Sequence, residues 1–286
     1  MLVMAASSVL FSVVGVFVPL AAPANSSIIA AARFVVGIVS IVGFSFIGLG
    51  RLTTVNRWWL VLRGVIGGLS VYLYYRGIAK LGLGTGTILN YSYPVFAALL
   101  APLLVKERLT WDVVAAVIVS FGGIWLVVSP SVLQGGNAAG GLPLGLETAF
   151  ALLGGILAGV AVVAIKKLRE TDSPQIIYLA QCFFGLLIVG WPAATSSFSF
   201  GAVTWVILLG IGGLATVAQL MMTWAYKHVP ATEGSLLGFL VPVISVGLGA
   251  AVFGERMRAA SLAGSAIVLL CCGYVAFRER IWRLVG

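Results

Sequence analysis

Residues 86–108 read GTILNYSYPVFAALLAPLLVKER, and residues 234–256 read GSLLGFLVPVISVGLGAAVFGER. The second stretch repeats the first at an offset of 148 residues, and the same offset aligns glycines elsewhere in the chain. The matched positions are Gly37 with Gly185, Gly64 with Gly212, Gly86 with Gly234, Pro94-Val95 with Pro242-Val243, and Glu107-Arg108 with Glu255-Arg256. One offset shared by all of these pairs indicates an internal duplication. We therefore expect a first repeat over residues 1–130, a linker over 131–144 and a second repeat over 145–286.

The composition around these repeats is that of a membrane protein. Of the 286 residues, 61% are hydrophobic and 9% are charged, and the mean hydropathy is +1.13. Soluble domains carry roughly a quarter charged residues, so a soluble or disordered chain is excluded. The net charge of +9 does not predict nucleic-acid binding, because the basic residues lie at the ends of apolar segments. The expected environment is the lipid bilayer.

The apolar residues form ten runs, each near the ~20 residues that a helix needs to cross the hydrocarbon core. The runs are Leu2 to Ala22, Ile28 to Leu49, Trp58 to Ile78, Thr85 to Val105, Val113 to Val128, Leu146 to Ile165, Pro174 to Ala194, Ala202 to Trp224, Thr232 to Phe253 and Ala259 to Phe277. They are continuous rather than alternating, which excludes transmembrane strands. The first run is expected to be a helix and not a cleaved signal, because no Lys or Arg precedes it. The sequence predicts an all-α membrane protein with ten transmembrane helices.

Five helices per repeat is an odd number, so the second repeat must enter the membrane in the opposite orientation to the first. The predicted architecture is therefore two inverted-topology five-helix repeats. If the amino terminus is cytoplasmic, most basic residues fall in inner loops and the carboxy-terminal tail. The positive-inside rule then predicts that both termini are cytoplasmic and that the linker over 131–144 is extracytoplasmic. Two inverted halves also suit alternating access, because rocking can expose a site between them to either side.

Several short motifs surround the quoted stretch. They are Tyr74-Tyr75-Arg76-Gly77-Ile78-Ala79-Lys80-Leu81, Thr85-Gly86-Thr87, Tyr93-Pro94-Val95-Phe96 and Lys106-Glu107-Arg108-Leu109. The second half carries related motifs, namely Ala225-Tyr226-Lys227-His228-Val229, Pro242-Val243 and Gly254-Glu255-Arg256-Met257. Together with Ala32-Arg33-Phe34, they resemble the EamA domain of the drug/metabolite transporter superfamily over essentially the whole chain.

That resemblance implies a ten-helix, multi-pass protein of the bacterial inner membrane that exports amino acids, drugs or other metabolites. The subgroup nearest in overall character is the exporters of aromatic amino acids and amphiphiles. The chain departs from the family pattern at two places. Phe11 to Gly15 stand where the family often has a Trp-Gly pair, and Gln181-Cys182 stand where Arg-Phe would be expected.

Polar and aromatic residues near the centres of four runs predict a substrate site at the bilayer midplane, where such side chains are retained when they touch substrate or water. Helical spacing places them on shared faces. The predicted substrate-binding residues are Tyr72, Thr87, Asn90, Tyr91, Thr216, Gln219, Ser235 and Phe239. The rings offer apolar area and the amides and hydroxyls offer donors and acceptors, which suits a small amphiphilic solute. The alternative is that the hydroxyls bond their own or neighbouring helices.

Other residues are candidates for the substrate path or for conformational change. Arg33, Tyr75 and Trp224 are the predicted path residues. Arg33 would either extend to the outer surface or contact an anion. Pro94 and Pro242 interrupt the hydrogen-bond ladder near mid-helix, and we predict that they are paired hinges, with a static kink as the alternative.

These features predict a secondary transporter that exports amino acids, aromatic or neutral, by alternating access. One alternative is multidrug or metabolite efflux coupled to protons, which is disfavoured because no Asp or Glu lies near the middle of a predicted helix. The other is an intramembrane lipid-modifying enzyme, which is disfavoured because the chain has one His and no HExxH motif. No catalytic, metal, cofactor or nucleotide motif is expected. Glycine pairs such as Gly64 and Gly68 permit close helix contact, so a monomer or a weak homodimer is predicted.

Overall fold

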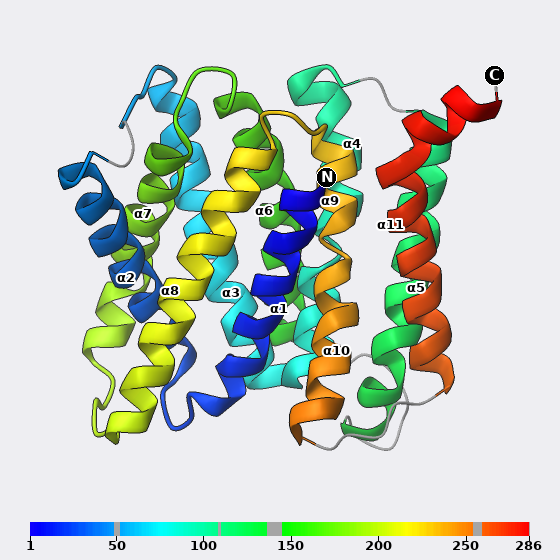
Figure 1. Cartoon of the computed structure of the whole chain (residues 1–286). Helices are drawn as coiled ribbons and strands as arrows, with labels where there is room; N and C mark the ends of the chain where they lie inside the picture. Colours follow the sequence, from blue (N-terminus) through cyan, green and yellow to red (C-terminus); the bar gives the residue numbers. More distant parts are fainter. Residues whose placement is uncertain (49–51, 108–109, 136–144, 254–258, 286) are drawn as a thin grey trace.

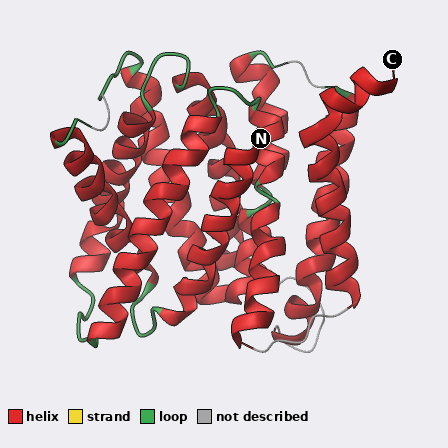
Figure 2. Ribbon diagram, viewed as in Figure 1, coloured by secondary structure: helices red, strands yellow, loops and turns green. Residues whose placement is uncertain are grey.

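A computed structural model describes residues 1–48, 52–107, 110–135, 145–253 and 259–285 (Figure 1). Over these ranges the chain is helical and contains no strand (Figure 2), which confirms the all-α prediction. The helices are α1 (Leu2–Leu20), α2 (Ser26–Phe46), α3 (Arg57–Asn90), α4 (Tyr93–Val105), α5 (Trp111–Gly135), α6 (Leu146–Leu168), α7 (Pro174–Ala194), α8 (Ala202–Ala225), α9 (Ala231–Leu237), α10 (Leu240–Phe253) and α11 (Ala259–Val285). Most of the predicted linker (136–144) and the Glu255-Arg256 pair lie outside the described residues.

Within the described part of the chain, five helices are long and apolar enough to cross a membrane, by length and composition: α1, α2, α6, α7 and α8. Two of them begin with the same kind of cap at positions that the 148-residue offset relates. Asn25 Oδ1 accepts a hydrogen bond from Ile28 N at 3.0 Å before α2, and Ser173 Oγ accepts from Ile176 N at 3.4 Å before α7. Such side chains satisfy amide groups that the first helical turn leaves free. The duplication is therefore visible in the capping as well as in the sequence.

Helix α3 covers two predicted crossings because the chain turns back within it. In a straight helix the nine residue steps from Gly77 to Gly86 would span about 13 Å. Instead, a Cβ atom on Gly86 would lie 2.6 Å from the Gly77 carbonyl carbon. The two segments are therefore antiparallel and touch through their glycine backbones, as expected for the separate runs Trp58 to Ile78 and Thr85 to Val105.

The fourth crossing of each repeat is interrupted. In the first repeat, helical structure stops at Tyr91 and Ser92 and resumes as α4 at Tyr93. In the second repeat it stops at Gly238 and Phe239 and resumes as α10. Tyr91 and Phe239 are equivalent under the 148-residue offset, so both breaks fall at the same place. Pro94 and Pro242 follow each break within the first turn of the next helix, where a missing amide hydrogen costs little.

Helices of one repeat pack mainly against helices of the other. Helix α3 contacts α6 and α7, and its equivalent α8 contacts α1 and α2. Helix α4 contacts α6, and its equivalent α10 contacts α1, while α2 packs on α7 and α5 on α11. Exchanging the two repeats leaves this set of contacts unchanged, as a twofold relation requires. The repeats are therefore interlocked (Figure 1).

The glycine pair Gly64 and Gly68 lies at a contact between two helices of the same chain. A Cβ on Gly68 would lie 2.5 Å from Gly185 Cα, and one on Gly64 would lie 2.8 Å from the Ala180 carbonyl oxygen. Both partners belong to α7. The absence of side chains at these positions lets α3 and α7 approach closely, as small residues do between membrane helices.

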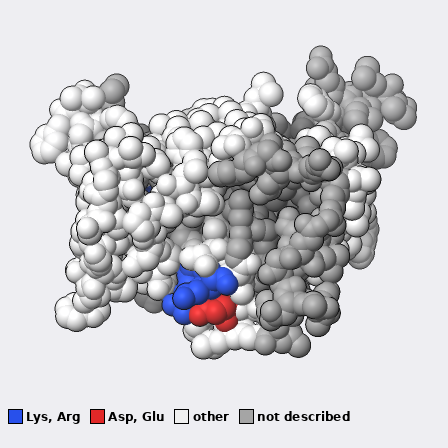
Figure 3. All heavy atoms as spheres, turned by 90° about the horizontal axis from the view of Figure 1, so that it is seen from below, with Lys and Arg blue, Asp and Glu red and all other residues white. Residues whose placement is uncertain are grey.

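The described charged side chains gather mainly at the upper end of the bundle as drawn in Figure 1. The α4, α6 and α8 ends there carry Lys106, Lys166, Lys167, Arg169 and Lys227. At the lower end the described charges are Arg76, Lys80 and Glu147, and Arg76 forms an ion pair with Glu147 at 2.6 Å. Figure 3 shows that end from below, with basic and acidic side chains of the described residues next to each other in one group.

Candidate functional site: a cavity between the repeats

A cavity of about 120 Å³ lies between the two repeats. Its described lining comes chiefly from α1, α3, α6 and α8, together with residues at both helix breaks. Asn90 and Tyr91 contribute from the first break, and Gly238 contributes from the second. Discontinuous helices that meet at a cavity are how secondary transporters commonly build a binding site within the membrane.

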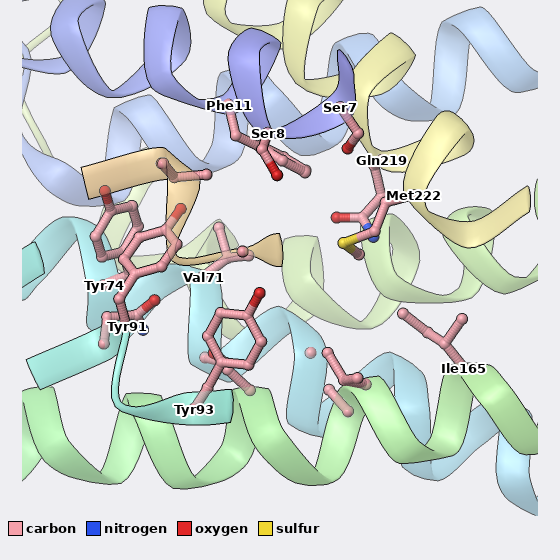
Figure 4. A pocket seen from close by; sticks show the side chains of 18 of the residues that line it. Ser7, Ser8, Phe11, Val71, Tyr74, Tyr91, Tyr93, Ile165, Gln219 and Met222 are labelled. Carbon is pink, nitrogen blue, oxygen red and sulfur yellow. The ribbon is translucent and has the colours of Figure 1, made fainter. Parts of the chain in front are cut away.

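One wall of the cavity is aromatic. The ring centroid of Tyr74 lies 6.0 Å from that of Tyr91, and that of Tyr91 lies 5.8 Å from that of Tyr93. Figure 4 shows these three rings on one side of the cavity and Gln219 and Met222 on the other. Adjacent tyrosines offer large apolar faces together with hydroxyl groups. The wall can therefore hold an apolar or aromatic body beside polar groups.

Two buried arginines also line the cavity. Arg33 is 5% exposed; it donates to the Tyr75 hydroxyl at 3.1 Å and to Gln219 Oε1 at 3.3 Å. Its guanidinium carbon lies 5.7 Å from the centre of the Phe11 ring. Because the side chain points inward, it does not extend to the outer surface, which was one of the two roles predicted for it.

Arg63 is 2% exposed and donates to Gln181 Oε1 at 2.9 Å. Gln181 in turn donates to the Gly67 carbonyl oxygen at 3.2 Å. The Arg63 side chain runs along its own helix over Gly67, where a Cβ atom would overlap the guanidinium Nη1. Gly67 therefore leaves the space in which the guanidinium lies.

Five residues predicted from the sequence line this cavity: Arg33, Tyr75, Asn90, Tyr91 and Gln219. The two amide side chains among these five residues each have a buried nitrogen without a hydrogen-bond partner, namely Asn90 Nδ2 and Gln219 Nε2. Unpartnered donors of this kind are uncommon in buried sites and are available to a ligand or to water. The structure thus brings part of the predicted set together from α2, α3 and α8 and the first helix break.

The other predicted residues lie outside the described lining. Thr216 Oγ1 donates to the Gly212 carbonyl oxygen at 2.8 Å, and Ser235 Oγ donates to the Thr232 carbonyl oxygen at 2.8 Å. Each hydroxyl therefore bonds a carbonyl of its own helix, which was the alternative to a role in substrate binding. The predicted residues outside the lining are Tyr72, Thr87, Thr216, Trp224, Ser235 and Phe239, with Pro94 and Pro242. Their roles in binding, path or hinge stay predictions.

Phe239 and Trp224, two of these residues, make contacts elsewhere in the structure. Phe239 is 0% exposed and packs in the apolar core. Trp224 is 48% exposed, and its ring lies 5.2 Å from that of His228 on the outside of the bundle. Neither residue is among the described residues that line the cavity.

Several lining residues were missed by the sequence reasoning. They are Ser7, Ser8, Phe11, Arg63, Tyr74, Tyr93, Gln181 and Met222. A signal existed for Arg63, because an ionisable side chain within an apolar run is a functional candidate in itself. A signal existed also for Tyr74 and Met222, which the 148-residue offset makes equivalent. The serines of α1 offered none, since that helix precedes the region in which the offset holds.

The comparisons with known proteins agree with this architecture. The model of the EamA-like transporter family matches residues 1–129 and 146–277. A pseudopaline exporter of Pseudomonas aeruginosa is 26% identical over 216 residues, which cover 74% of this chain and 72% of that protein. A probable terminal-alkyne amino-acid exporter of Streptantibioticus cattleyicolor is 39% identical over 71 residues, covering 25% of this chain and 24% of that protein.

Two transporters of Helicobacter pylori of uncharacterized activity are 28% identical over 194 residues. The match covers 64% of this chain and spans 59% of the length of those proteins. A crystal structure superposes with a TM-score of 0.77 at 16% identity and covers 96% of this chain and 94% of that one, which shows a shared fold. The family and these relatives are transporters and not enzymes, as the sequence predicted. Because the family model covers both repeats, the chain belongs to the EamA-like transporter family.

Proposed function

We propose that the protein is a secondary transporter that exports small amphiphilic metabolites, amino acids with aromatic or neutral side chains among them. The observation that carries the proposal is the cavity between the repeats, which is lined by the rings of Tyr74, Tyr91 and Tyr93 and by the buried amide groups of Asn90 and Gln219. An apolar wall with a few fixed polar groups is the usual form of a small-molecule site. The named exporters among the relatives support export rather than uptake.

Alternating access is the mechanism that this arrangement favours. The repeats, over residues 1–130 and 145–286, are inverted, and each contributes one interrupted helix to the cavity. Rocking of one set of helices against the other around a fixed site would open the cavity to the two sides in turn. Pro94 and Pro242, which follow the two breaks, are the proposed hinges. The unit that carries out this cycle is proposed to be a monomer.

The orientation follows from the basic residues. The upper loops carry Lys106, Lys166, Lys167, Arg169 and Lys227, so this end is proposed to face the cytoplasm of a bacterial inner membrane, with both termini on that side. A Ser197→Cys variant should then react with an impermeant maleimide added to intact cells, and Thr171→Cys only after permeabilisation. The reverse pattern would contradict this orientation.

The transport proposal is tested with purified protein in liposomes preloaded with unlabelled L-phenylalanine, by following entry of the labelled amino acid. Counterflow above that of protein-free liposomes is expected. Tyr91→Ala should lower the initial rate at subsaturating substrate by about tenfold or more, since loss of an apolar contact costs about 1–3 kcal/mol. Tyr274→Phe, which removes a hydroxyl that bonds Asp112 away from the cavity, is the control. A rate equally unaffected by both changes would contradict binding at this cavity.

A further inference from the structure

Among the residues that the structure describes, the hydrogen-bond partners of the two cavity arginines are all neutral. Arg33 contacts a phenol and an amide oxygen, and Arg63 contacts an amide oxygen. Arg33 Nε and both Arg63 Nε and Nη1 are buried without a hydrogen-bond partner. Among the described residues that line the cavity, these two are the charged ones, and both are cations.

Burying two guanidinium charges without a counter-charge costs free energy, and an anion bound beside them would offset that cost. A buried charge is tolerated in proteins when it is paired or fully hydrogen-bonded, and the same holds for ionisable groups within membranes. Neutral amide and phenol oxygens accept hydrogen bonds but bring no opposite charge. Arginine, moreover, stays protonated in proteins, so neither group can escape the penalty by losing its proton. The missing component is therefore a negative charge in the cavity.

The position of Arg63 is built into the helix. Gly67, one turn further along α3, leaves the space that the guanidinium occupies, and Gln181 holds the side chain there from α7. Gln181 is the 148-residue equivalent of Arg33. Arg33, on the second helix of the first repeat, donates to Gln219. Gln181, at the equivalent position on the second helix of the second repeat, accepts from Arg63. Each second helix therefore contributes one member of an Arg–Gln pair.

We propose that the cavity selects amphiphiles with a net negative charge, whose carboxylate or other anionic group is held by Arg33 and Arg63 while the apolar body lies against the tyrosines. The inference rests on the proposed transport function and narrows its substrate class. A free amino acid brings a carboxylate but also an ammonium group, for which the described lining offers no carboxylate and which two guanidinium groups repel. Acidic amphiphiles without a free amine are therefore the better substrates.

Three probes of the same size separate the charge states: 3-phenylpropanoate is an anion, L-phenylalanine a zwitterion and phenethylamine a cation. Counterflow of each is measured in proteoliposomes, with passive leak subtracted from protein-free liposomes. Binding is measured independently as the rise in thermal unfolding temperature of the purified protein in detergent. At equal subsaturating concentration we expect the anion to exchange at least about tenfold faster than the zwitterion, and the cation not to exchange.

The variants assign the preference to the arginines. Arg63→Gln and Arg33→Gln should each lower exchange of 3-phenylpropanoate about tenfold or more and reduce its advantage over L-phenylalanine. Gly67→Ala keeps both charges but displaces the Arg63 guanidinium, so it should raise the half-saturating concentration of the anion. Arg57→Gln makes the same chemical change at an exposed position of α3 and is the matched control. A preference that persists in both cavity variants would overturn the proposal.

The outcomes separate this inference from the transport proposal. If L-phenylalanine or phenethylamine exchanges as fast as the anion, the protein is a transporter and the charge selection is wrong. If 3-phenylpropanoate raises the unfolding temperature of the wild type but not of Arg63→Gln, and no probe exchanges, the anion site stands and the transport proposal fails. If no probe binds or exchanges, both are contradicted.

Discussion

The two helix breaks occupy equivalent places in the two repeats, but different features support them. The first break, at Tyr91 and Ser92, lies against a glycine of α6, where a Cβ on Gly155 would come within 2.5 Å of the Leu89 carbonyl oxygen. That carbonyl also accepts a hydrogen bond from Ser92 Oγ, three residues further along, at 2.7 Å. Close backbone packing therefore supports the first break.

The second break is supported by hydrogen bonds from α1. Ser8 Oγ lies 3.1 Å from the Leu237 carbonyl oxygen, and Ser12 Oγ lies 3.2 Å from the Val241 carbonyl oxygen. Serine side chains of a neighbouring helix commonly satisfy the backbone groups that a broken membrane helix frees. The same backbone feature is thus obtained by two independent sets of contacts.

The side chains at the two breaks differ even more. Equivalent positions carry Asn90 and Gly238, Tyr91 and Phe239, and Tyr93 and Val241. Polar aromatic residues and the amide lie in the first repeat, and apolar residues or glycine lie in the second. The duplication therefore preserved the backbone geometry of the break, while the tyrosines and the asparagine beside it occur in the first repeat.

The largest expected effect comes from truncating the equivalent rings. Phe239→Ala should lower the free energy of unfolding by about 3–5 kcal/mol, because the ring is 0% exposed in the core. Tyr91→Ala should cost less stability and act mainly on transport, because its ring borders the cavity. Unfolding in mixed detergent micelles measures the first and counterflow the second. Equal losses of stability would show that the two breaks are packed alike.

A second, smaller effect tests the glycine support of the first break. Gly155→Ala places a Cβ against a backbone carbonyl that cannot move aside easily, so we expect a loss of about 1–3 kcal/mol in unfolding free energy. The control is Gly213→Ala in α8, where a Cβ would meet nothing within 4 Å and alanine should stabilise the helix by up to about 1 kcal/mol. The same sign for both variants would contradict the close-packing account.

The sequence predicted the fold more fully than the site. Hydropathy and the 148-residue offset were enough for the helices and the inverted repeat, because both depend on patterns spread over many residues. The site depends on which way single side chains point, and the breaks at Tyr91 and Phe239 change that direction. Ideal helical spacing across a break aligned Phe239 with Ser235 and Pro242, and in the structure its side chain packs in the core.

Arg63 was passed over for a related reason. Its charge near the start of an apolar run was visible in the sequence. The inward direction of its side chain, however, depends on the space left by Gly67 one turn further along and on the hydrogen bond with Gln181 of another helix. Such a contact between distant parts of the chain leaves no periodic pattern. Asn90 and Gln219 were both recognisable as amides in otherwise apolar helices, and both line the cavity.

The serine support of the second break should give a modest effect. Ser8→Ala and Ser12→Ala each remove one bond between helices together with a bond to a carbonyl oxygen of α1 itself. Bonds between helices average about 0.6 kcal/mol in membrane proteins. Ser45→Ala removes a hydroxyl that bonds only the Ile41 carbonyl oxygen of its own helix, so it is the control. If Ser45→Ala costs as much stability as Ser8→Ala, the bonds across helices contribute nothing specific to the break.

The smallest effect on stability is expected at the two prolines. Pro94→Ala and Pro242→Ala should change the unfolding free energy by no more than about 0.5 kcal/mol, because each proline occupies a first helical turn. Counterflow should nevertheless slow in both variants if the breaks are hinges, since alanine lets the helix continue across the break. Unchanged counterflow in both would remove the hinge hypothesis and leave a static kink.

The two cavity arginines also have an electrical consequence. A transporter that carries a monoanion outward without a proton moves one elementary charge across the membrane in each cycle. The membrane potential of a bacterium is negative inside, and 100 mV is worth about 2.3 kcal/mol per charge, or about a 50-fold concentration ratio at equilibrium. The arginines of the cavity would thereby let the potential itself expel an acidic solute, in a direction fixed by the sign of the voltage.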